Sequence, residues 1–499
     1  MSKIVLKKKL CIGFDLGTTN SLAARFSSNK IKILKDKNGQ KLLPSVVKYE
    51  KNKILVGWNA LKNYKGNKEN IIFSIKRLIG LSKEKIKILY PKLPYSYKED
   101  SNNEICIKTI QGFIKISTIT SQILSVLKKR VINQFNREID HSVITVPAYF
   151  DNKQRKEIKK SAFLAGLTNV RLLNEPTSAA IAYGCNLKKK ELVAIYDLGG
   201  GTFDFSLLKL ENDVFEVLTT TGNSHLGGDD FDFLLIEYIF KKYFKLLIDN
   251  EKIKKKIFSR VKFLKKELSF KKKVSFKIQN FLIEITRNEF NKLIEPLVKK
   301  TLMICKRALI SVDIRIDKIN EIILVGGSTH IPIIQKKIEL FFKKKPLSSI
   351  NPEEAVVIGS AIHSENLSGN ISKKKKFLLI DVLHLSLGIE VMGGIVEKII
   401  KKNTKLPTEC TKIFTNFQDN QTSIKIHILQ GEGKLVKDCR SLFCFSLSGI
   451  TPQLAGINRI FINFKIDNDG LLHVSVVDKI SKNKKNMTIN TIDDFNILK

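Results

Sequence analysis

The residues best suited to chemistry lie in a glycine-rich stretch, 194–206, with the sequence Ala-Ile-Tyr-Asp-Leu-Gly-Gly-Gly-Thr-Phe-Asp-Phe-Ser. An apolar run ends at Asp197, three glycines come next, and from Thr202 apolar and polar residues alternate with the period of a strand. The pattern predicts a strand, a glycine turn and a second strand, with a carboxylate at the mouth of the hairpin. Bare N–H groups in such a turn can hold a phosphate, and a carboxylate beside the phosphate needs a bridging cation, usually Mg²⁺.

A second stretch repeats this pattern near the start of the chain. Asp15-Leu-Gly-x-Thr19 matches Asp197-Leu-Gly-x-Gly-Thr202, and each comes after an apolar run. One glycine turn is a weak signal, but two copies indicate two related subdomains that close on a single nucleotide. The stretch at 194–206 is not a P-loop, because it contains no Gly-Lys-Ser/Thr and leads into a strand.

The composition sets limits on size and partners. With 499 residues, 43% of them hydrophobic, the chain is long enough for two or three domains with substantial cores. A formal net charge of +39 would suit a nucleic acid or a membrane surface, but the lysines are spread through almost every segment. Because the chain is also rich in Ile, Asn and Phe, we favour compositional drift toward AT-rich codons and expect neither a nucleic-acid nor a membrane partner.

Cysteine usage indicates the compartment. Seven cysteines, an odd number without Cys-x-x-Cys spacing, favour a reducing environment and argue against a zinc site or a disulfide framework. The nearest pair, Cys439 and Cys444, is interpreted as core thiols. No apolar run approaches the roughly 20 residues of a membrane span, and no signal peptide is expected, because Asp15 interrupts the apolar run after the basic start. We therefore expect a cytoplasmic protein.

Three further segments carry polar residues that have both a structural and a functional interpretation. Residues 70–80 have a helical period, and Lys76 is either one of a solvated pair with Arg77 or a cation that stabilises a transferring phosphate. Glu175 stands where a predicted strand meets a small-residue helix, so orienting a water and capping the helix are equally open. A glycine turn within 322–332 suits a base or ribose, although a plain strand–helix turn has the same pattern.

The character of the sequence changes after residue 372. Four lysines at 373–376 and an apolar strip to Asp381 are typical of an interdomain linker that docks when required. Short alternating segments then recur between turn signals such as Asp-Asn-Asp-Gly at 467–470. They predict a compact β domain with strands at 423–429, 442–447, 460–466 and 471–477.

Taken together, the sequence resembles the seventy-kilodalton heat-shock chaperone family. The motifs that carry the resemblance run in the family's order, and they are Phe14-Asp-Leu-Gly-Thr-Thr-Asn-Ser21, Asn174-Glu-Pro-Thr177, Asp197-Leu-Gly-Gly-Gly-Thr-Phe-Asp204, Val325-Gly-Gly-Ser-Thr329 and Leu385-Ser-Leu-Gly-Ile-Glu390. The resemblance implies an α/β actin-like ATPase domain of two lobes with duplicated ribonuclease-H-like subdomains at 1–372 and a linker at 373–381. An all-β sandwich that binds peptides would occupy 382–499, and the family's helical lid is expected to be absent.

Within the family, segments 290–302 and 431–442 are most similar to the branch that serves iron–sulfur cluster assembly, and Phe417, where general chaperones carry a small residue, agrees. The similarity implies an ATP-dependent chaperone that binds a short Leu-Pro-Pro-Val-Lys-like segment of a cluster scaffold protein. A J-domain co-chaperone would deliver this client. The implied cofactors are ATP/ADP and Mg²⁺, with K⁺ as a further candidate.

The family's site residues transfer to this chain by position. Asp15 and Asp197 would hold Mg²⁺ through water, Lys76 would steady the γ-phosphate, and Glu175, Asp204 and Thr202 would help to place the water, ions or phosphate. The phosphates would lie against Gly17, Thr18, Thr19, Asn20, Gly200, Gly201 and Thr202. The adenosine pocket would be lined by Lys265, Ser269, Gly327, Ser328 and His330.

The resemblance also implies a relay and a peptide slot. Pro147, Arg155, Leu378 and Leu379 match the family's relay between nucleotide and linker. An apolar slot for an extended peptide, bound by main-chain hydrogen bonds, would be formed by Ile389, Met392, Phe414, Ile424 and Ile426. Without the resemblance, these five residues would be interpreted as core.

Departures from the family pattern are expected to have effects. His330 stands where the family usually has an arginine on the adenine, so nucleotide affinity is expected to be weaker, and lysines 373–376 replace a usually acidic linker entry. Without a lid, a bound peptide is expected to leave faster.

Three alternative functions are weighed. A general folding chaperone would bind unrelated unfolded peptides as tightly as a Pro-Pro segment. Residues 378–477 argue against an actin-fold small-molecule kinase, which needs neither linker nor sandwich. A degenerate nucleotide-binding scaffold is opposed by the retained Asp15, Lys76, Glu175, Asp197 and Thr202.

Overall fold

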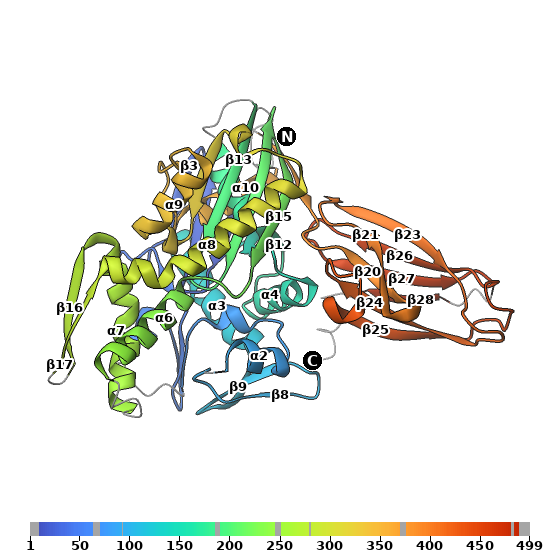
Figure 1. Cartoon of the computed structure of the whole chain (residues 1–499), viewed down its shortest axis with the longest axis horizontal. Coiled ribbons are helices and arrows are strands. Elements are labelled where there is room, and N and C mark those ends of the chain that lie inside the picture. Colours follow the sequence, from blue (N-terminus) through green and yellow to red (C-terminus); the bar gives the residue numbers. More distant parts are fainter. Residues whose placement is uncertain are drawn as a thin grey trace, which may run out of the picture.

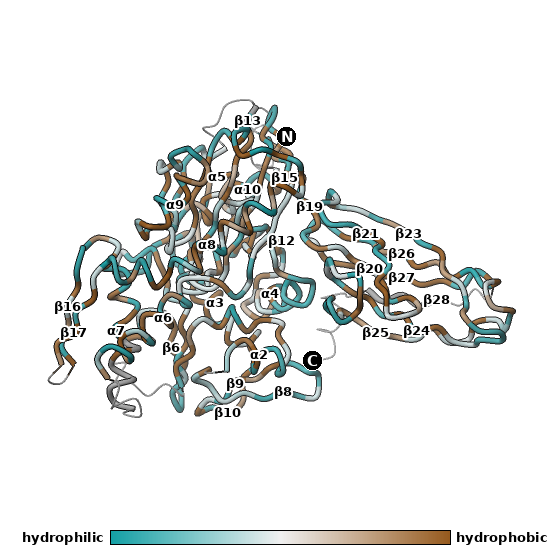
Figure 2. The backbone as a smooth tube through the Cα atoms, in the orientation of Figure 1, coloured by the Kyte–Doolittle hydropathy of each residue, from teal (hydrophilic) through white to brown (hydrophobic). Residues whose placement is uncertain are grey.

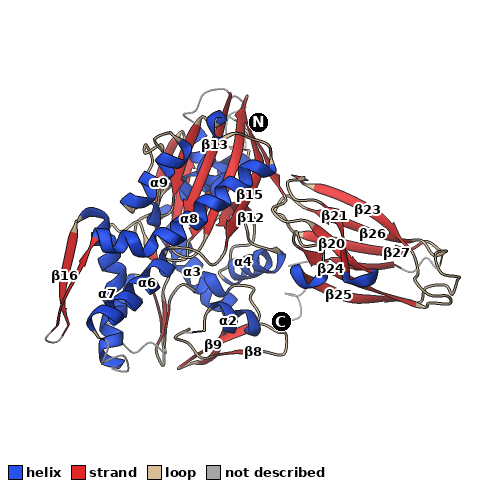
Figure 3. Ribbon diagram, viewed as in Figure 1, coloured by secondary structure: helices blue, strands red, loops and turns tan. Residues whose placement is uncertain are grey.

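The computed structural model describes residues 9–62, 70–91, 93–184, 190–244, 251–278, 281–369, 376–480 and 484–488. They form two regions that lie side by side (Figure 1). Residues 9–369, called the α/β region, mix helices and sheets, whereas residues 383–488, called the β region, are built from strands with short 3₁₀ helices (Figure 3). Of the lysine run 373–376, residues 373–375 lie outside the described residues.

A six-stranded sheet is the framework of the first half of the α/β region. Its order is β12-β11-β1-β2-β3, and β4 pairs with β2. Because β1 is parallel to β11 and antiparallel to β2, the β1–β2 turn lies at the same edge as the end of β11. The strands span Cys11–Leu16 (β1), Asn20–Ser27 (β2), Lys30–Ile33 (β3), Leu43–Pro44 (β4), His141–Val146 (β11) and Val170–Asn174 (β12).

A second six-stranded sheet, in the order β18-β13-β14-β15-β19-β22, repeats this arrangement. β13 and β14 form a hairpin that continues antiparallel into β15, and β13 is parallel to β18, as β1 is to β11. The repeated sequence motif therefore belongs to a repeated topology. These strands span Lys190–Leu198 (β13), Phe203–Glu211 (β14), Val214–Asn223 (β15), Glu321–Val325 (β18), Leu378–Val382 (β19) and Lys405–Leu406 (β22).

Helices cover the two sheets, and two of them lie between the sheets. A Cβ at Gly359 of α10 would lie 1.7 Å from the carbonyl oxygen of Ser178 in α5, so these helices cross in close contact. The helices are α1 (Trp58–Leu61), α2 (Lys83–Leu89), α3 (Ile116–Phe135), α4 (Asn152–Leu164), α5 (Glu175–Gly184), α6 (Gly228–Tyr243), α7 (Glu251–Phe270), α8 (Arg287–Ser311), α9 (Pro332–Phe342) and α10 (Ala355–Leu367), with 3₁₀ helices η1 (Ile75–Leu78), η2 (Ile316–Lys318) and η3 (Gly327–His330).

Three small sheets complete the α/β region. One joins β6, β5 and β7, another joins β10, β9 and β8, and the third is the β16–β17 hairpin beside α7 (Figure 1). Their strands span Val47–Tyr49 (β5), Ile54–Val56 (β6), Ile71–Ile72 (β7), Tyr97–Glu99 (β8), Ile105–Thr109 (β9), Gly112–Lys115 (β10), Lys273–Ile278 (β16) and Phe281–Thr286 (β17).

The β region consists of two four-stranded sheets, β21-β20-β24-β25 and β23-β26-β27-β28. Inward side chains of both sheets, such as Ile428 and Phe464, share one buried cluster, and hydrophobic segments run through the interior of both regions (Figure 2). The four strands predicted for this region are confirmed. Its elements span Leu387–Val391 (β20), Met392–Gly394 (η5), Ile395–Ile400 (β21), Thr408–Phe414 (β23), Ser423–Gln430 (β24), Val436–Asp438 (η6), Arg440–Ser448 (β25), Ile460–Ile466 (β26), Leu472–Asp478 (β27) and Lys484–Thr488 (β28).

Two expectations from the sequence are wrong. Residues 70–80 are not one helix, because Ile72 pairs with β5, Ser74 takes a positive φ of 50°, and only η1 comes after it. Cys439 and Cys444 are not both core thiols, since Cys444 is exposed on β25.

Candidate functional site

The two glycine hairpins meet across one cleft. The turn between β1 and β2 brings Thr18 and Thr19 against the turn between β13 and β14. A Cβ at Gly200 would lie 2.2 Å from Thr19 Oγ1, and a Cβ at Gly201 would lie 2.9 Å from Thr18 Cγ2. A Cβ at either glycine would press on the facing threonine side chain, so the close approach of the two turns favours glycine at both positions. The predicted phosphate residues 17–20 and 200–202 are thus brought together.

Acidic side chains gather at the base of this cleft. Burial and the neighbouring Glu175 carboxylate raise the pKa of Asp15 to about 7, and burial followed by Glu175 raises the pKa of Asp204 to about 7. The pKa of Asp197 is also raised, by burial and by the charges of Glu175, Asp204 and Asp15. Asp15 and Asp197, predicted to face each other, therefore lie within electrostatic reach in one site.

Lys76 is the cation that enters this acidic cluster. It forms a buried ion pair with Glu175, and its side chain is only 4% exposed. The interpretation of Lys76 and Arg77 as a solvated pair is therefore wrong, because both are buried. Burial this complete needs a partner for each charge, and the partners come from α5 and α6.

Among the described residues, no group of three or more acidic, histidine or cysteine side chains is placed to ligate a metal ion directly, so a divalent cation here would be held through its retained waters. When the three buried acids are ionised, their negative charges repel one another and destabilise the folded protein. A cation with its retained waters removes that repulsion. Hard oxygen donors of this kind are what Mg²⁺ prefers. The glycine turns provide the second part of the fit, since glycines bring bare backbone N–H groups close to the acids.

The residues predicted for adenosine lie on the far side of the same turns. Ser328 Oγ donates to the Gly199 carbonyl at 2.8 Å, which ties η3 to the β13–β14 turn. Lys265 Nζ donates to the Gly228 carbonyl at 2.5 Å and pairs with Asp232 at 2.9 Å, and Ser269 lies one turn further along α7. Gly327 is exposed and His330 half-buried at the end of η3. Through Ser328 and Lys265, η3 and α7 are thus tied to the β13–β14 turn and to the start of α6.

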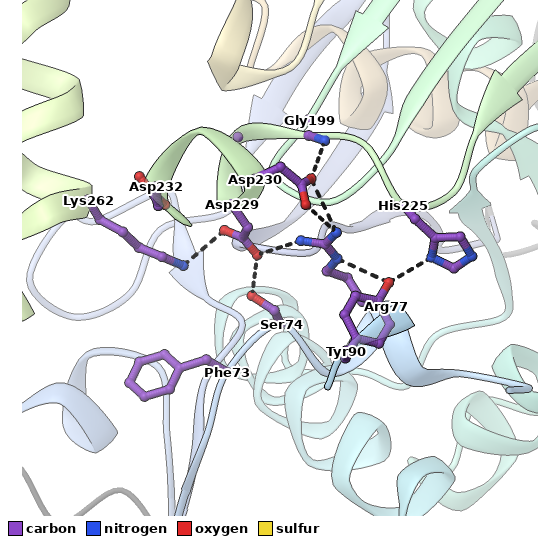
Figure 4. A network of polar contacts seen from close by, with 12 residues as sticks. Phe73, Ser74, Arg77, Tyr90, Gly199, His225, Asp229, Asp230, Asp232 and Lys262 are labelled. Carbon is purple, nitrogen blue, oxygen red and sulfur yellow. Dashed lines mark hydrogen bonds and ion pairs between the residues drawn. The ribbon is translucent and has the colours of Figure 1, made fainter. Parts of the chain in front are cut away.

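An ion network that the sequence did not predict spans the cleft beside the phosphate turns (Figure 4). Arg77 Nη2 of η1 contacts both carboxylate oxygens of Asp230 on α6, at 3.1 and 3.2 Å, and Nη1 lies 3.8 Å from Asp229. Ser74 donates to Asp229 at 2.7 Å, and Lys262 of α7 pairs with it at 3.2 Å. The Gly-Gly-Asp-Asp sequence at 227–230 was the available signal, but its partner Arg77 lies far away in the sequence.

Tyr90 extends this network away from the phosphate turns. Its hydroxyl accepts from Arg77 Nε at 3.3 Å and lies 2.7 Å from His225 Nδ1 (Figure 4). Burial and then the charge of Arg77 lower the pKa of His225 to about 4. The ring is therefore neutral near pH 7 and adds no positive charge to the network. The ion pairs of Arg77 with Asp229 and Asp230, called the strap, link the two halves of the α/β region.

Of the predicted relay residues, Arg155 is bonded to the end of the linker strand through Asn174. Arg155 of α4 donates to the Asn174 side chain at 2.7 Å, and Asn174 donates to Asp381 of β19 at 2.8 Å. Asn174 directly precedes Glu175 of the cleft. Pro147 is buried at the end of β11, and its carbonyl accepts the Phe150 N–H at 3.1 Å.

The linker is a strand rather than a free segment. Leu378, Leu379 and Ile380 of β19 run parallel to residues 214–216 of β15, and the Leu378 N–H donates to the Asp213 carbonyl at 3.0 Å. Leu379 packs on a core cluster that includes Phe215, whereas Leu378 is 58% exposed. The second sheet thereby extends from the nucleotide turns into the β region.

Contacts with the β region surround α4. Asp469, in the turn between β26 and β27, pairs with Lys159 at 2.5 Å and with Arg171 at 2.9 Å. Arg440 at the start of β25 pairs with Asp151, the N-cap of α4. Charges at both ends of α4 therefore hold the two regions together.

The five predicted peptide residues fall into two groups. Ile389 and Ile426 are buried in the core between the sheets, and Phe414 and Ile424 are half-buried against that core. Met392, in η5, is 72% exposed. The structure thus places Met392 at the surface, whereas the other four belong to the core between the sheets or pack against it.

Comparisons with known proteins address the identity of the chain. A model of the family described as Hsp70 protein matches residues 11–496. Chaperone protein HscA of Buchnera aphidicola subsp. Baizongia pistaciae is 50% identical over 484 residues, which are 97% of this chain and 94% of that protein. Chaperone protein HscA of Buchnera aphidicola subsp. Acyrthosiphon pisum (strain Tuc7) is 49% identical, over 98% of this chain and 81% of its own length. The homolog from Mannheimia succiniciproducens is 44% identical, over 94% and 76%.

No helix within the described part of the chain has the length and apolar character that a membrane span requires. Two glycine hairpins facing one acidic cleft, a linker strand and a two-sheet β region accompany a match along nearly the whole sequence. By these criteria the chain belongs to the Hsp70 family.

Proposed function

We propose that this chain is an ATP-hydrolysing chaperone that couples nucleotide binding to the capture and release of a short extended peptide. Residues 1–372 would form an actin-like ATPase domain with duplicated ribonuclease-H-like subdomains. Residues 373–381 would be the linker, and 382–499 a β-sandwich that binds peptide. The observation that carries the proposal is the bonded path from the cleft through Asn174 to Asp381 of the linker strand.

In the proposed hydrolysis of ATP, each charged residue of the cleft would have its own role. Bound Mg²⁺ and ATP would supply a shielded γ-phosphate for attack by water, with K⁺ as a further ion. Asp15 and Asp197 would hold the metal through water, and Lys76 would stabilise charge on the γ-phosphate. Glu175, in contact with Lys76, would orient the attacking water, and Thr202 and Asp204 would complete the phosphate and ion contacts.

Binding of ATP would draw Lys76 from Glu175 toward the phosphate. The freed carboxylate lies next to Asn174, which bonds Arg155 and Asp381. A shift of this strand end would strengthen or weaken the docking of β19 and the β region. Docking and the peptide slot would then respond to the same nucleotide.

The client is proposed to be an iron–sulfur cluster scaffold protein in the cytoplasm, delivered by a J-domain co-chaperone. Its Leu-Pro-Pro-Val-Lys-like segment would lie in the slot formed by Ile389, Met392, Phe414, Ile424 and Ile426. Support comes from the names of the relatives and from the exposure of Met392, a flexible apolar side chain suited to grip a peptide.

The test is single-turnover ATP hydrolysis with the co-chaperone and a Leu-Pro-Pro-Val-Lys peptide, compared with the same peptide in which Pro-Pro is replaced by Ala-Ala. We expect about 5- to 100-fold stimulation by the first peptide only. Equal stimulation by both peptides would instead favour a general folding chaperone. A background rate under all conditions would favour a degenerate nucleotide-binding scaffold.

The slot has its own matched pair of variants. Met392→Ala removes an exposed side chain of the proposed slot, whereas Ile413→Ala removes one that is 55% exposed on the opposite face of β23 from Phe414. We expect peptide affinity to fall about tenfold for Met392→Ala and to stay within twofold for Ile413→Ala, measured by fluorescence anisotropy. Equal losses would reject the slot.

A further inference from the structure

A histidine lies at the junction of the two regions, immediately after the linker strand. His384 comes two residues after β19, and its side chain is 6% exposed. The ring packs on Tyr149 of the α/β region, with centroids 5.5 Å apart and planes inclined by 55°. The contact joins one region to the other, so the ring is buried by docking as well as by its own region.

The cavity around His384 is lined by both regions. Phe150, Arg155 and Asn174 contribute from the α/β region, and Gln430 and Asp469 from the β region. Among the described residues, His384 Nε2 has no hydrogen-bond partner, and neither has Gln430 Oε1. Burying a polar atom without a hydrogen-bond partner costs free energy of desolvation. Burying the protonated, charged imidazole of His384 would cost much more.

Charged groups face this ring from every element packed against it. Arg155 of α4 and Lys402, between β21 and β22, oppose a positive ring. Asp381 on β19, Asp469 in the β26–β27 turn and Glu432 after β24 bring negative charge, but each is engaged elsewhere, with Asn174, Lys159 and Lys398 respectively. No direct carboxylate partner reaches the imidazole within the described residues.

We propose that His384 makes docking of the β region sensitive to protons, because the docked arrangement accepts only the neutral imidazole. Acidification would then release the β region and the linker strand from the α/β region. The inference rests on the nucleotide-driven docking proposed above and adds to it a second input, the proton concentration.

Linkage gives the direction of the effect. Burial, and then the charges of Arg155 and Lys402, lower the pKa of His384 from its ordinary 6.5 to about 3 in the docked structure. Undocking therefore takes up a proton at acidic pH, and the docking free energy is fully present above the ordinary pKa and lost as pH falls below it. The docking constant should fall about fourfold from pH 7.5 to pH 6.0 and about tenfold to pH 5.5.

One buried acid at the junction acts in the opposite direction. Burial raises the pKa of Asp381, so protonation of this carboxyl favours docking at low pH. A variant that removes only the titration of His384 separates its effect on docking from that of Asp381. His384→Gln keeps a polar side chain that does not titrate, and His141→Gln removes a histidine that is bonded to Asn169 in the α/β region instead.

The experiment is small-angle X-ray scattering of the full chain with saturating ATP and a regenerating system, at pH 7.5 and 5.5. We expect the docking constant, taken from the compact and extended fractions, to fall about tenfold from pH 7.5 to pH 5.5 for wild type and His141→Gln, and not to fall for His384→Gln. Equal expansion of wild type and His384→Gln would overturn the role of His384. Failure of ATP to compact the wild type at pH 7.5 would instead overturn the docking itself.

A measurement on the wild type keeps the inference testable if the variants dock poorly. The His384 ring is monitored by NMR in ¹³C-histidine protein during titration from pH 8 to 5. With ADP the ring is expected to titrate near the free histidine value, whereas with ATP its midpoint is expected at a lower pH, together with undocking. The same titration with both nucleotides would refute the proposal.

Discussion

At the scale of single residues, the acids between the two glycine hairpins destabilise the folded protein when they are ionised. Asp15, Asp197 and Asp204 are buried among like charges, and their raised pKa values reflect the cost of ionising them there. Since Asp15 is far from the other two acids in sequence, the cluster is created by the fold. A cluster that costs stability without its cation indicates a site kept for binding.

The cost can be measured from the pH dependence of stability. Because the pKa of Asp15 is about 7 when folded, well above its ordinary 3.8, its ionisation lowers stability progressively as pH rises from about 4 to 7. We expect Asp15→Asn to raise the melting temperature of the metal-free, nucleotide-free protein by several degrees at pH 7.5 and hardly at pH 4.5. A variant less stable than wild type at pH 7.5 would contradict this explanation.

Lys76 carries the second prediction at this scale. Lys76→Ala removes the cation that would meet the transferring phosphate and leaves Glu175 without its partner. Single-turnover hydrolysis should fall about 100- to 1000-fold. Lys48→Ala, which breaks a partly exposed pair with Glu50, is the matched control and should leave the rate within twofold. Comparable rates for both variants would remove Lys76 from the mechanism.

At the scale of elements, β19 is the strand through which the second sheet reaches the β region. It adds a parallel strand to β15, whose neighbour β14 begins at the glycine turn. Only a few residues form this pairing, so it can detach without unfolding either sheet. The strand therefore suits a reversible connection more than a structural one.

The two leucines of β19 provide a matched pair for testing it. Leu379 packs against Phe215 and its neighbours, whereas Leu378 is 58% exposed. Leu379→Asp places a charge in an apolar contact and should abolish the ATP-triggered acceleration of peptide release, measured by stopped-flow fluorescence. Leu378→Asp should retain most of that acceleration. If both variants behave alike, the docked pairing does not govern release.

At the scale of the whole molecule, docking depends on charges that lie in different regions. Asp469 is 7% exposed and contacts Lys159, Arg171 and the Leu172 N–H across the junction. Removing this carboxylate would leave Lys159 and Arg171 without their partner. Asp469 thus collects several contacts across the junction in one side chain, in addition to the Arg440–Asp151 pair.

Asp469→Asn should release the β region while both regions stay folded. We expect a larger radius of gyration with ATP and a loss of most of the ATP-driven change in peptide affinity, with unchanged affinity in ADP. Glu409→Gln, on an exposed position of β23, is the control and should behave as wild type. A compact Asp469→Asn protein with ATP would show that other contacts suffice.

The sequence predicted the parts of this molecule that depend on local pattern. The hairpin at 194–206 results from a strand period and glycines, and the β-region strands result from alternation. The strap from Arg77 to Asp230 could not be predicted, because its residues are 153 positions apart and each looks like a surface charge. His384 was missed for the same reason, since its burial depends on Tyr149 in the other region.

The extension of the second sheet by the linker has a consequence for solubility. When β19 leaves, the backbone of residues 214–216 becomes an open sheet edge, a surface that recruits strands from other chains. The undocked form should therefore be the one that self-associates as concentration rises. In the proposed cycle, each undocking of β19 would therefore expose this edge until the strand docks again.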